Sequence, residues 1–227
     1  MKKKLRALVL GATGLVGREC LNLLLNHPHY SEVVVLTRNS TEIYHPKLKE
    51  YKIDFDFLER WAHCFEGINH VFCCLGTTMK TARSKEAFKK VDFDIPLRCA
   101  EMAKEKKVDN FILISSIGAN KKSKISYSRI KGEIEEKIGD LRLQSFSVLR
   151  PSLLLGERKE NRRGERVGSF FAKKVGPLML GPLRPYRAVS SQKVAETMIS
   201  LANQESIRHG IETKVYILGK IRGKKRV

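Results

Sequence analysis

The sequence alternates between two kinds of segment, and this alternation constrains its fold more than any other feature. Short runs rich in apolar and β-branched residues predict six strands, at residues 6–10, 32–37, 69–75, 110–116, 145–150 and 215–219. Longer runs with the helical spacing of apolar residues lie between them, at residues 16–27, 84–107, 126–138 and 190–203. Strands that alternate with helices favour a parallel sheet with helices on both faces. We therefore expect a single α/β domain, residues 1–227, built on a doubly wound parallel sheet.

The composition is ordinary, with 42% hydrophobic and 30% charged residues in a chain of 227. That length is enough for one domain with a full core. No apolar run approaches the roughly 18 residues of a membrane span. Lysines precede the first apolar run, but Arg6 interrupts it and Arg18 ends it, so we expect a strand and turn there rather than a signal peptide.

The net charge of +20 is unusual, and such a field attracts phosphates and other anions. No zinc finger, RNA-binding strand motif or basic patch with interleaved aromatic residues accompanies it. A solvated basic surface is therefore favoured over a nucleic-acid site.

The five cysteines lack the spacing of zinc ligands, so we expect no metal. Reduced thiols favour a cytoplasmic location.

A glycine-rich turn, GATGLVG, directly follows the first expected strand. Gly11 permits a tight turn, Gly14 lets a pyrophosphate approach the backbone, and Gly17 lets the next helix pack close to the strand. Because the turn lies between a strand and a helix, a dinucleotide site is favoured over a tight turn without a ligand. The turn residues expected to contact the cofactor are Gly11, Thr13, Gly14, Leu15, Val16 and Gly17.

The end of the second expected strand distinguishes NAD from NADP. NAD-binding proteins usually place Asp or Glu there to hold the ribose hydroxyls, whereas an Arg accommodates the 2′-phosphate of NADP. Here Thr37, Arg38 and Asn39 occupy the position, and the first carboxylate after them is Glu42. An arginine can bond the phosphate and stack on adenine, so NADP(H) is the expected cofactor. The alternative is that Arg38 is one surface cation among 44 Lys and Arg.

Two further segments are expected beside the cofactor. Asp54 and Phe55 stand where short-chain reductases bracket the adenine. Gly76, Thr77 and Thr78 form a loop of small residues that can pass close to the cofactor ribose. A role in loop geometry alone explains Gly76 equally well.

The candidate catalytic residues lie on and after the strand that ends in Ser115 and Ser116. Tyr127 follows Ser116 by eleven residues, and Lys131 comes four residues later on the same face of an expected helix. In a short-chain reductase the tyrosine delivers a proton as hydride arrives, the lysine holds the nicotinamide ribose, and the serine orients the carbonyl. We predict that Ser116, Tyr127 and Lys131 are catalytic, and that Ser115 and Lys131 contact the cofactor.

A tyrosine and a lysine four apart also arise by chance in a basic protein. Tyr216 and Lys220 repeat the spacing, but they lie on an expected strand, where side chains four apart are separated along the chain. No strand that ends in serine directly precedes them. The context of Tyr127 and Lys131, rather than their spacing, therefore carries the prediction.

Four segments together resemble the atypical short-chain dehydrogenases of the Tat-interacting-protein type. They are VFCCLGTT, ISSIGA, YSRIKGEIE and RPSLLLGERKENRRGE. The resemblance implies a Rossmann-like fold with bound NADPH, and it gives the three glycines, Arg38, Ser116, Tyr127 and Lys131 the roles stated above. It also explains the adjacent Cys73 and Cys74 as a feature of a family strand rather than a redox pair.

Two segments near these motifs depart from the usual short-chain reductase pattern, and a third matches it. The helix at residues 84–107 offers Asp92 and Asp94 where an asparagine often completes the proton relay. The loop after the preceding strand reads Leu-Gly-Thr, where short-chain reductases usually have Asn-Ala-Gly. Pro151 looks like part of the segment that reaches the nicotinamide carboxamide.

Residues 151–190 are expected to form the substrate side of the site. Arg158 and Arg162 in this stretch suit an anionic group by bidentate pairing. Ion pairs between these arginines and glutamates of the same loop are an alternative that is slightly favoured.

The ordered series of motifs predicts an NADP(H)-dependent oxidoreductase that acts on a carbonyl or hydroxyl group of a small-molecule substrate. The alternative is a non-catalytic NADPH-binding protein that reports redox state to a protein partner. The changed Leu-Gly-Thr loop and a small expected pocket motivate this alternative. Nucleic-acid binding is not expected.

Overall fold

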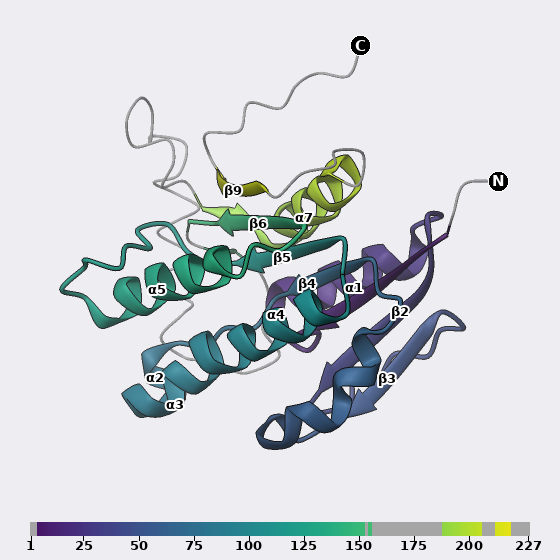
Figure 1. The fold of residues 1–227 in the computed structure, drawn as a ribbon, viewed down its shortest axis with the longest axis horizontal. Coiled ribbons are helices and arrows are strands. Elements are labelled where there is room, and N and C mark those ends of the chain that lie inside the picture. The colour runs from purple at the N-terminus through teal and green to yellow at the C-terminus, as the bar shows by residue number, and fades with distance from the viewer. Residues whose placement is uncertain (1–3, 153, 156–187, 206–211, 219–227) are drawn as a thin grey trace, which may run out of the picture.

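A computed structural model describes residues 4–152, 154–155, 188–205 and 212–218 of the chain. Seven parallel strands form one sheet in the order β3-β2-β1-β4-β5-β6-β9 (Figure 1). The first six strands have the order of the Rossmann fold, and β9 extends the sheet beyond β6. The expected Rossmann-like α/β fold in a single domain is therefore confirmed.

The strands of the sheet are β1 Leu5–Leu10, β2 Tyr30–Thr37, β3 Leu48–Lys52, β4 His70–Cys73, β5 Asn110–Ile114, β6 Ser145–Arg150 and β9 Glu212–Ile217. Two short strands pair separately, β7 Leu154–Leu155 and β8 Val189–Ser190. The α-helices are α1 Leu15–Asn26, α2 Met79–Ala82, α3 Lys85–Lys89, α4 Ile95–Glu105, α5 Ser126–Asp140 and α7 Ser191–Glu205. A 3₁₀ helix, η1, spans Phe55–Phe65, and a π-helical turn, η2, spans Lys90–Asp94.

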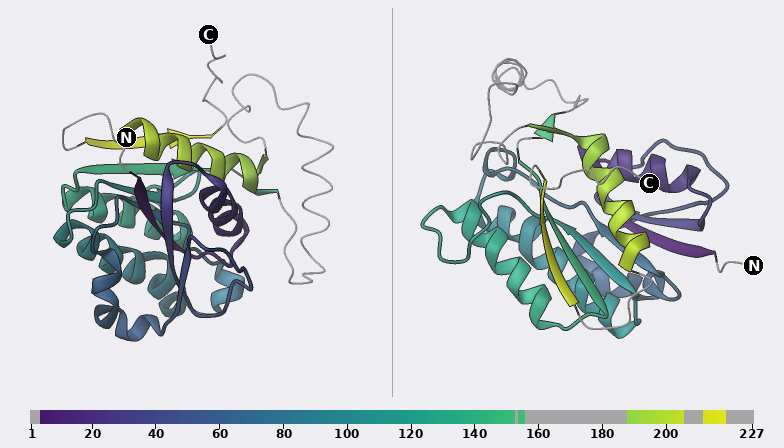
Figure 2. Two further views of the ribbon diagram at one scale, coloured as in Figure 1. Left: turned by 90° about the vertical axis from the view of Figure 1, so that its right-hand side faces the viewer. Right: turned by 90° about the horizontal axis from the view of Figure 1, so that it is seen from above.

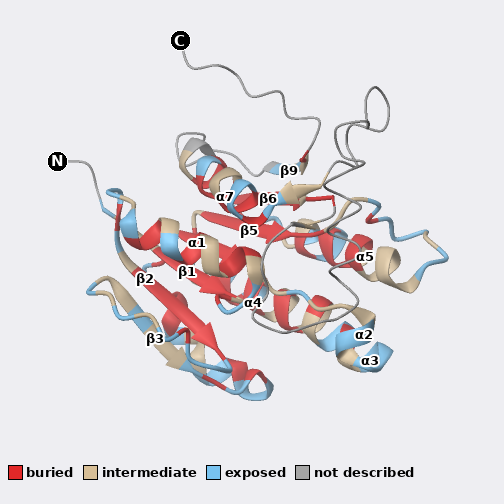
Figure 3. Cartoon of the chain, turned by 180° about the vertical axis from the view of Figure 1, so that it is seen from behind, coloured by how far each residue is buried: buried red, intermediate tan, exposed pale blue. Residues whose placement is uncertain are grey.

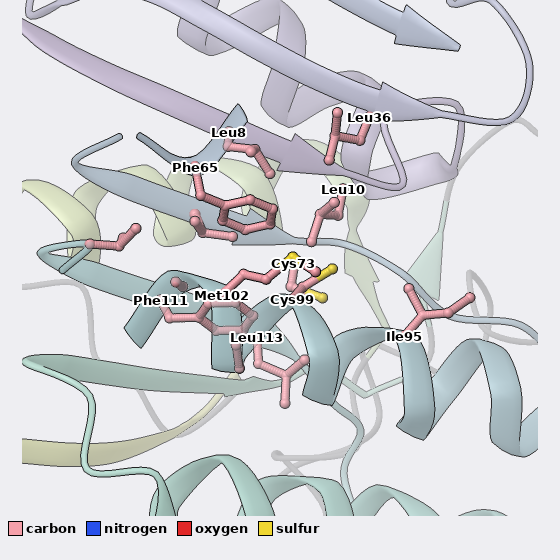
Figure 4. Close-up of a cluster of buried hydrophobic side chains, with 14 of the residues drawn as sticks. Leu8, Leu10, Leu36, Phe65, Cys73, Ile95, Cys99, Met102, Phe111 and Leu113 are labelled. Atoms are coloured by element: carbon pink, nitrogen blue, oxygen red, sulfur yellow. The ribbon is translucent and has the colours of Figure 1, made fainter. Parts of the chain in front are cut away.

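Helices cover both faces of the sheet, because alternate residues of each strand point to opposite faces (Figure 2). On one face, Leu8 and Leu10 of β1 join a hydrophobic cluster with η1, α4 and α5. Figure 4 shows that Phe111 and Leu113 of β5 belong to the same cluster. On the other face, Val9 packs with α1 and α7. The central strands between these layers are largely buried (Figure 3).

All six expected strands are present, and the structure adds β3 at the edge of the sheet. The sequence of β3, LKEYK, contains three charged residues and none that is fully buried, so it lacks an apolar pattern. The expected helix at residues 84–107 is divided, because η2 separates α3 from α4 and Pro96 lies in the first turn of α4. No helix in the described part of the chain is long and apolar enough to cross a membrane.

Candidate functional site

The candidate site lies at the carboxyl ends of the central strands. β1 has β2 on one side and β4 on the other, so the connections that follow β1 and β4 lead in opposite directions. In this fold class, ligands bind at such a point of reversal. The loops that follow β1, β2, β4 and β5 carry most of the residues that the sequence predicts for the site.

The glycine-rich turn has a backbone that other residues cannot reproduce. Gly11 has φ +78°, and a Cβ on it would lie 2.7 Å from the Cys74 carbonyl oxygen. A Cβ on Gly17 would overlap the Gly11 carbonyl oxygen, so the helix can approach the turn only because residue 17 is glycine. Gly14 donates its backbone N–H to Gly11 O over 3.0 Å and caps α1.

The N-terminus of α1 fits a phosphate group. Gly14 has no side chain to cap the helix, and no acidic residue lies in the first turn. Its first backbone N–H groups therefore remain for an anion, which the helix dipole also favours. Thr13 is exposed on the turn, and Leu15 is partly exposed. Val16 is buried among the residues that pack with α1 and α7, so it can offer a ligand only its backbone.

Arg38 is exposed directly after β2, where the sequence places it. Hydrogen bonds fix the loop around it: Thr37 Oγ1 donates to Asn39 O over 2.7 Å, and the Thr41 N–H donates to Glu50 Oε2 over 3.0 Å. The Glu50 carboxylate of β3 is thus engaged by the loop. The cation at the end of β2 is presented to solvent on an ordered loop.

Asp54 and Phe55 have structural partners at the start of η1. Asp54 Oδ1 accepts the Asp56 N–H over 3.0 Å and caps the helix. The Phe55 side chain is buried in the cluster beneath η1, and its carbonyl oxygen accepts a hydrogen bond from Arg98 Nη1 over 3.2 Å. A contact of Phe55 with adenine would therefore use its backbone rather than its ring.

The loop after β4 connects the cofactor side of the site to its catalytic side. Gly76 is exposed, and Thr78 caps α2 by accepting the Thr81 N–H on Oγ1 over 3.2 Å. The Thr77 N–H donates to Asp92 Oδ2 of η2 over 2.8 Å. The fold thus brings this loop against a carboxylate from a later segment of the chain.

Lys131 of α5 lies at the same carboxylate. Its Nζ is 2.7 Å from Asp92 Oδ1, and the two side chains are only 5% and 0% exposed. Burial alone would lower the pKa of Lys131, but the Asp92 carboxylate and the Tyr127 phenol raise that pKa above its ordinary value of 10.5. The lysine is therefore a buried cation. A Cβ on Gly76 would lie 3.8 Å from Lys131 Nζ, so the lysine borders the loop after β4.

Tyr127 and Ser116 approach the site from two further segments. Tyr127 lies in the first turn of α5, partly exposed, with its ring 5.6 Å from the Phe88 ring of α3. Ser116 follows β5, and its Oγ is buried without a hydrogen-bond partner among the residues that the structure describes. Buried hydroxyl groups normally have a partner, so this oxygen is suited to a ligand.

Ser115 has a different environment from its neighbour. Its Oγ donates to Glu135 Oε1 of α5, and the same carboxylate pairs with Arg150 of β6, whose Nε lies 3.0 Å from Oε1. The hydroxyl group is therefore engaged in a buried network at the strand ends. Only the backbone of Ser115 remains for the predicted cofactor contact.

The segment after β6 is described only in part. Pro151 is buried, and its carbonyl oxygen accepts the Ile117 N–H over 2.9 Å, which joins the ends of β5 and β6. Arg158 and Arg162 lie outside the described residues, as does most of the expected substrate-side stretch 151–190.

The cysteines lie in the described part of the chain, and four of the five are buried. All five are free. Burial raises the pKa of the Cys73 thiol to about 12, so little of the reactive thiolate is present near neutral pH. Within the described ranges, no three His, Cys, Asp or Glu side chains gather as metal ligands do.

The sequence offered Asp92, together with Asp94, in the place of the usual asparagine, but it did not distinguish between the two or indicate a partner. The contact of Asp92 with Lys131 joins positions 39 residues apart, and no local pattern indicates it. Pro96 was the available signal of a break in the expected helix, but it indicates neither a π-helical turn nor the partner of Asp92.

Comparisons with known proteins agree with this geometry. The family described as NAD(P)H-binding matches residues 11–205. The chain is 38% identical to Protein HTATIP2 of Rattus norvegicus over 166 residues, which cover 72% of this chain and 68% of that protein. It is 32% identical to "Protein FMP52, mitochondrial" of Candida albicans over 220 residues, or 93% of each chain.

Solved structures share the fold at low sequence identity. The UDP-glucose 4-epimerase of Thermotoga maritima superposes with a TM-score of 0.70 at 18% identity, covering 95% of this chain and 78% of that one. A short chain dehydrogenase family protein of Francisella tularensis gives a TM-score of 0.64 at 13% identity, covering 93% and 96%. With the family match, the chain belongs to the NAD(P)H-binding family as an atypical short-chain dehydrogenase/reductase of the Tat-interacting-protein type.

Proposed function

We propose that the protein is an NADP(H)-dependent oxidoreductase that acts on a carbonyl or hydroxyl group of a small-molecule substrate. The observation that carries the proposal is the position of Lys131. Its ammonium group is buried beside the loop that contains Gly76, so the candidate catalytic helix and the candidate cofactor loop border the same space. The family match and the glycine-rich turn support a dinucleotide in that space.

The chain's own groups would hold the cofactor along the carboxyl edge of the sheet. The N–H groups at the start of α1 would bind the pyrophosphate. The Lys131 ammonium group lies 2.7 Å from Asp92 Oδ1, and because it carries three N–H donors it can also donate to a ribose hydroxyl. Pro151, directly after β6, would lie towards the nicotinamide. When bound, the cofactor supplies or accepts hydride.

Three side chains would carry out the proton chemistry. The Tyr127 phenol donates a proton to the carbonyl oxygen during reduction and accepts one from the hydroxyl group during oxidation. The positive charge of Lys131, one helical turn later, stabilises the phenolate. Ser116 Oγ, which has no partner among the described residues, donates to the carbonyl oxygen and orients it.

A preference for NADPH over NADH tests the role of Arg38. Fluorescence titration of the purified protein should give tighter binding of NADPH, because the exposed guanidinium group can pair with the 2′-phosphate. Arg38→Ala should weaken NADPH binding by about tenfold or more and leave NADH binding nearly unchanged. Arg60→Ala removes the same charge from an exposed position of η1 and serves as the control. Equal affinity of the wild-type protein for both cofactors would refute the NADP assignment.

Turnover by Tyr127→Phe tests the catalytic role. On a panel of carbonyl substrates, the variant should lose about 100-fold or more in kcat while its NADPH affinity stays the same. Tyr44→Phe, at a fully exposed tyrosine, is the matched control. If the wild-type protein binds NADPH but turns over no substrate, the non-catalytic NADPH-sensing alternative is favoured.

We also propose a cytoplasmic location, on the basis of the free thiols. The fungal relative carries the word mitochondrial in its name. Fractionation of the source cells separates the two compartments, and recovery of the protein in the mitochondrial fraction would overturn the cytoplasmic assignment.

A further inference from the structure

Asp92 owes its position to the π-helical turn that interrupts the expected helix. α3 ends at Lys89, η2 continues to Asp94, and α4 begins at Ile95. A π turn inserts an extra residue and so changes the direction in which the following side chains point. Asp92 is buried against α5, whereas Asp94, two residues later, is at the surface and pairs with Lys89 over 3.5 Å. Two aspartates of one turn therefore have opposite environments.

The Asp92 carboxylate contacts two segments of the site at once. Oδ1 lies 2.7 Å from Lys131 Nζ, and Oδ2 accepts the Thr77 N–H over 2.8 Å. One carboxylate thus ties the lysine of α5 to the loop after β4. A Cβ on Gly76 would lie 3.5 Å from Oδ1, which places the pair directly beside that loop.

The Lys131 ammonium group depends on this partner. Among the described residues, the titratable groups that face it are Asp92 of η2, Tyr127 of α5 and Cys73 of β4. Glu135, one turn further along α5, is paired with Arg150 instead. Of the three facing groups, Asp92 is the carboxylate, and its Oδ1 is the atom that lies 2.7 Å from Lys131 Nζ. Without it, burial would favour the neutral amine of Lys131.

We propose that Asp92 is a positioning residue, whose carboxylate holds the Lys131 ammonium group in place and charged beside the loop of Gly76 and Thr77. An asparagine of the same shape could still accept the Thr77 N–H, but it would carry no charge for the lysine. The consequence for cofactor binding rests on the proposed function. The consequence for folding does not, because it concerns only a buried ion pair within the chain.

Urea unfolding at pH 7 and pH 9.5 tests the folding consequence without any cofactor. In the wild-type protein the pKa of Lys131 is raised in the folded state, so its contribution to stability is full below pH 10.5 and is lost only above it. In Asp92→Asn the pKa should instead fall below its unfolded value. Stability then rises with pH, and the midpoint of the variant should move towards the wild-type midpoint at pH 9.5.

Asp94→Asn is the matched control, because it removes the same charge from the same turn at an exposed pair. Its midpoint should stay close to that of the wild type at both pH values. If Asp92→Asn lowers the midpoint equally at pH 7 and pH 9.5, Asp92 supports the fold only through its shape, and the proposal is wrong.

A double variant keeps the test informative if Asp92→Asn alone does not fold. Asp92→Asn with Lys131→Met removes both charges while keeping similar side-chain volumes. We expect this protein to fold. Its urea midpoint should differ from the wild-type midpoint by the same amount at pH 7 and at pH 9.5. A double variant that is as unstable as the single variant would contradict the charge-based role.

NADPH titration gives the second readout. Between pH 7 and pH 9.5, Asp92→Asn should lose about tenfold more affinity than the wild type, because the lysine loses its charge in that range. Asp94→Asn should follow the wild type. If wild-type protein fails to bind NADPH, the proposed function fails while the unfolding result still decides the role of Asp92. If the wild-type protein binds NADPH and Asp92→Asn shows the same pH dependence of its affinity, only the predicted effect of Asp92 on cofactor binding is refuted.

Discussion

The glycine-rich turn and the Asp92–Lys131 pair lie in the same candidate site but are built in different ways. The turn is a contiguous segment, residues 11–17, whose geometry depends on the absence of a side chain at Gly11 and Gly17. The pair joins residues from η2 and α5 and depends on two charged side chains that are buried together. A site that is formed by backbone groups can be recognised from seven consecutive residues of the sequence. A region assembled from distant side chains exists only after the chain has folded.

Gly17→Ala is the most disruptive way to break the turn. A Cβ at this position would overlap the Gly11 carbonyl oxygen, and backbone atoms cannot move aside as a flexible side chain can. We expect a loss of about 3 kcal/mol in the free energy of unfolding, measured by urea denaturation. In Gly139→Ala the new Cβ would meet only Thr213 Oγ1, at 3.9 Å, so this helical variant should be as stable as the wild type or slightly more so. Similar losses in both variants would show that the turn is not closely packed.

The fold and the turn were predictable because their signals are local. Alternating apolar runs gave six of the seven strands of the sheet, and the position of the glycines between a strand and a helix gave the turn. β3 was the strand missing from those runs, because an edge strand with charged side chains has no apolar pattern. Pro96 indicates a break in the expected helix, but it does not indicate that the break is a π-helical turn.

The catalytic side was predictable only as a set of candidates. The spacing of Tyr127 and Lys131 indicated their shared helical face, but the partner of the lysine lies 39 residues earlier in the chain. Ser115 and Ser116 were both predicted beside the site. Both follow the end of β5, but the Ser115 hydroxyl donates to Glu135 of α5, whereas Ser116 Oγ has no partner among the described residues. What the sequence could not supply is which charged groups become buried together.

Glu135→Gln tests whether a second side-chain network behaves like the Asp92–Lys131 pair. The carboxylate accepts hydrogen bonds from Ser115 Oγ and Arg150 Nε, and removing its charge leaves a partly buried guanidinium group unpaired. We expect a loss of about 2 kcal/mol in the free energy of unfolding, less than for a fully buried pair because Arg150 keeps some contact with water.

The control for this network lies on the same helix. Glu133→Gln breaks an exposed pair with Arg129, whose Nε is 3.8 Å from Oε1, and should cost at most about 0.5 kcal/mol. Equal costs for the two glutamine variants would mean that burial adds nothing to the pair at the ends of β5 and β6.

Gly76→Ala should have the smallest effect on stability and yet separate the two regions most clearly. The new Cβ would lie 3.5 Å from Asp92 Oδ1 and 3.8 Å from Lys131 Nζ, which are ordinary contacts, so the free energy of unfolding should change by less than about 0.5 kcal/mol. The methyl group would nevertheless occupy the space proposed for the cofactor ribose. NADPH affinity, measured by fluorescence titration, should therefore fall about tenfold. Gly139→Ala, remote from the site, should bind NADPH as the wild type does. An unchanged affinity in Gly76→Ala would place the ribose elsewhere and leave the glycine with a role in loop geometry alone.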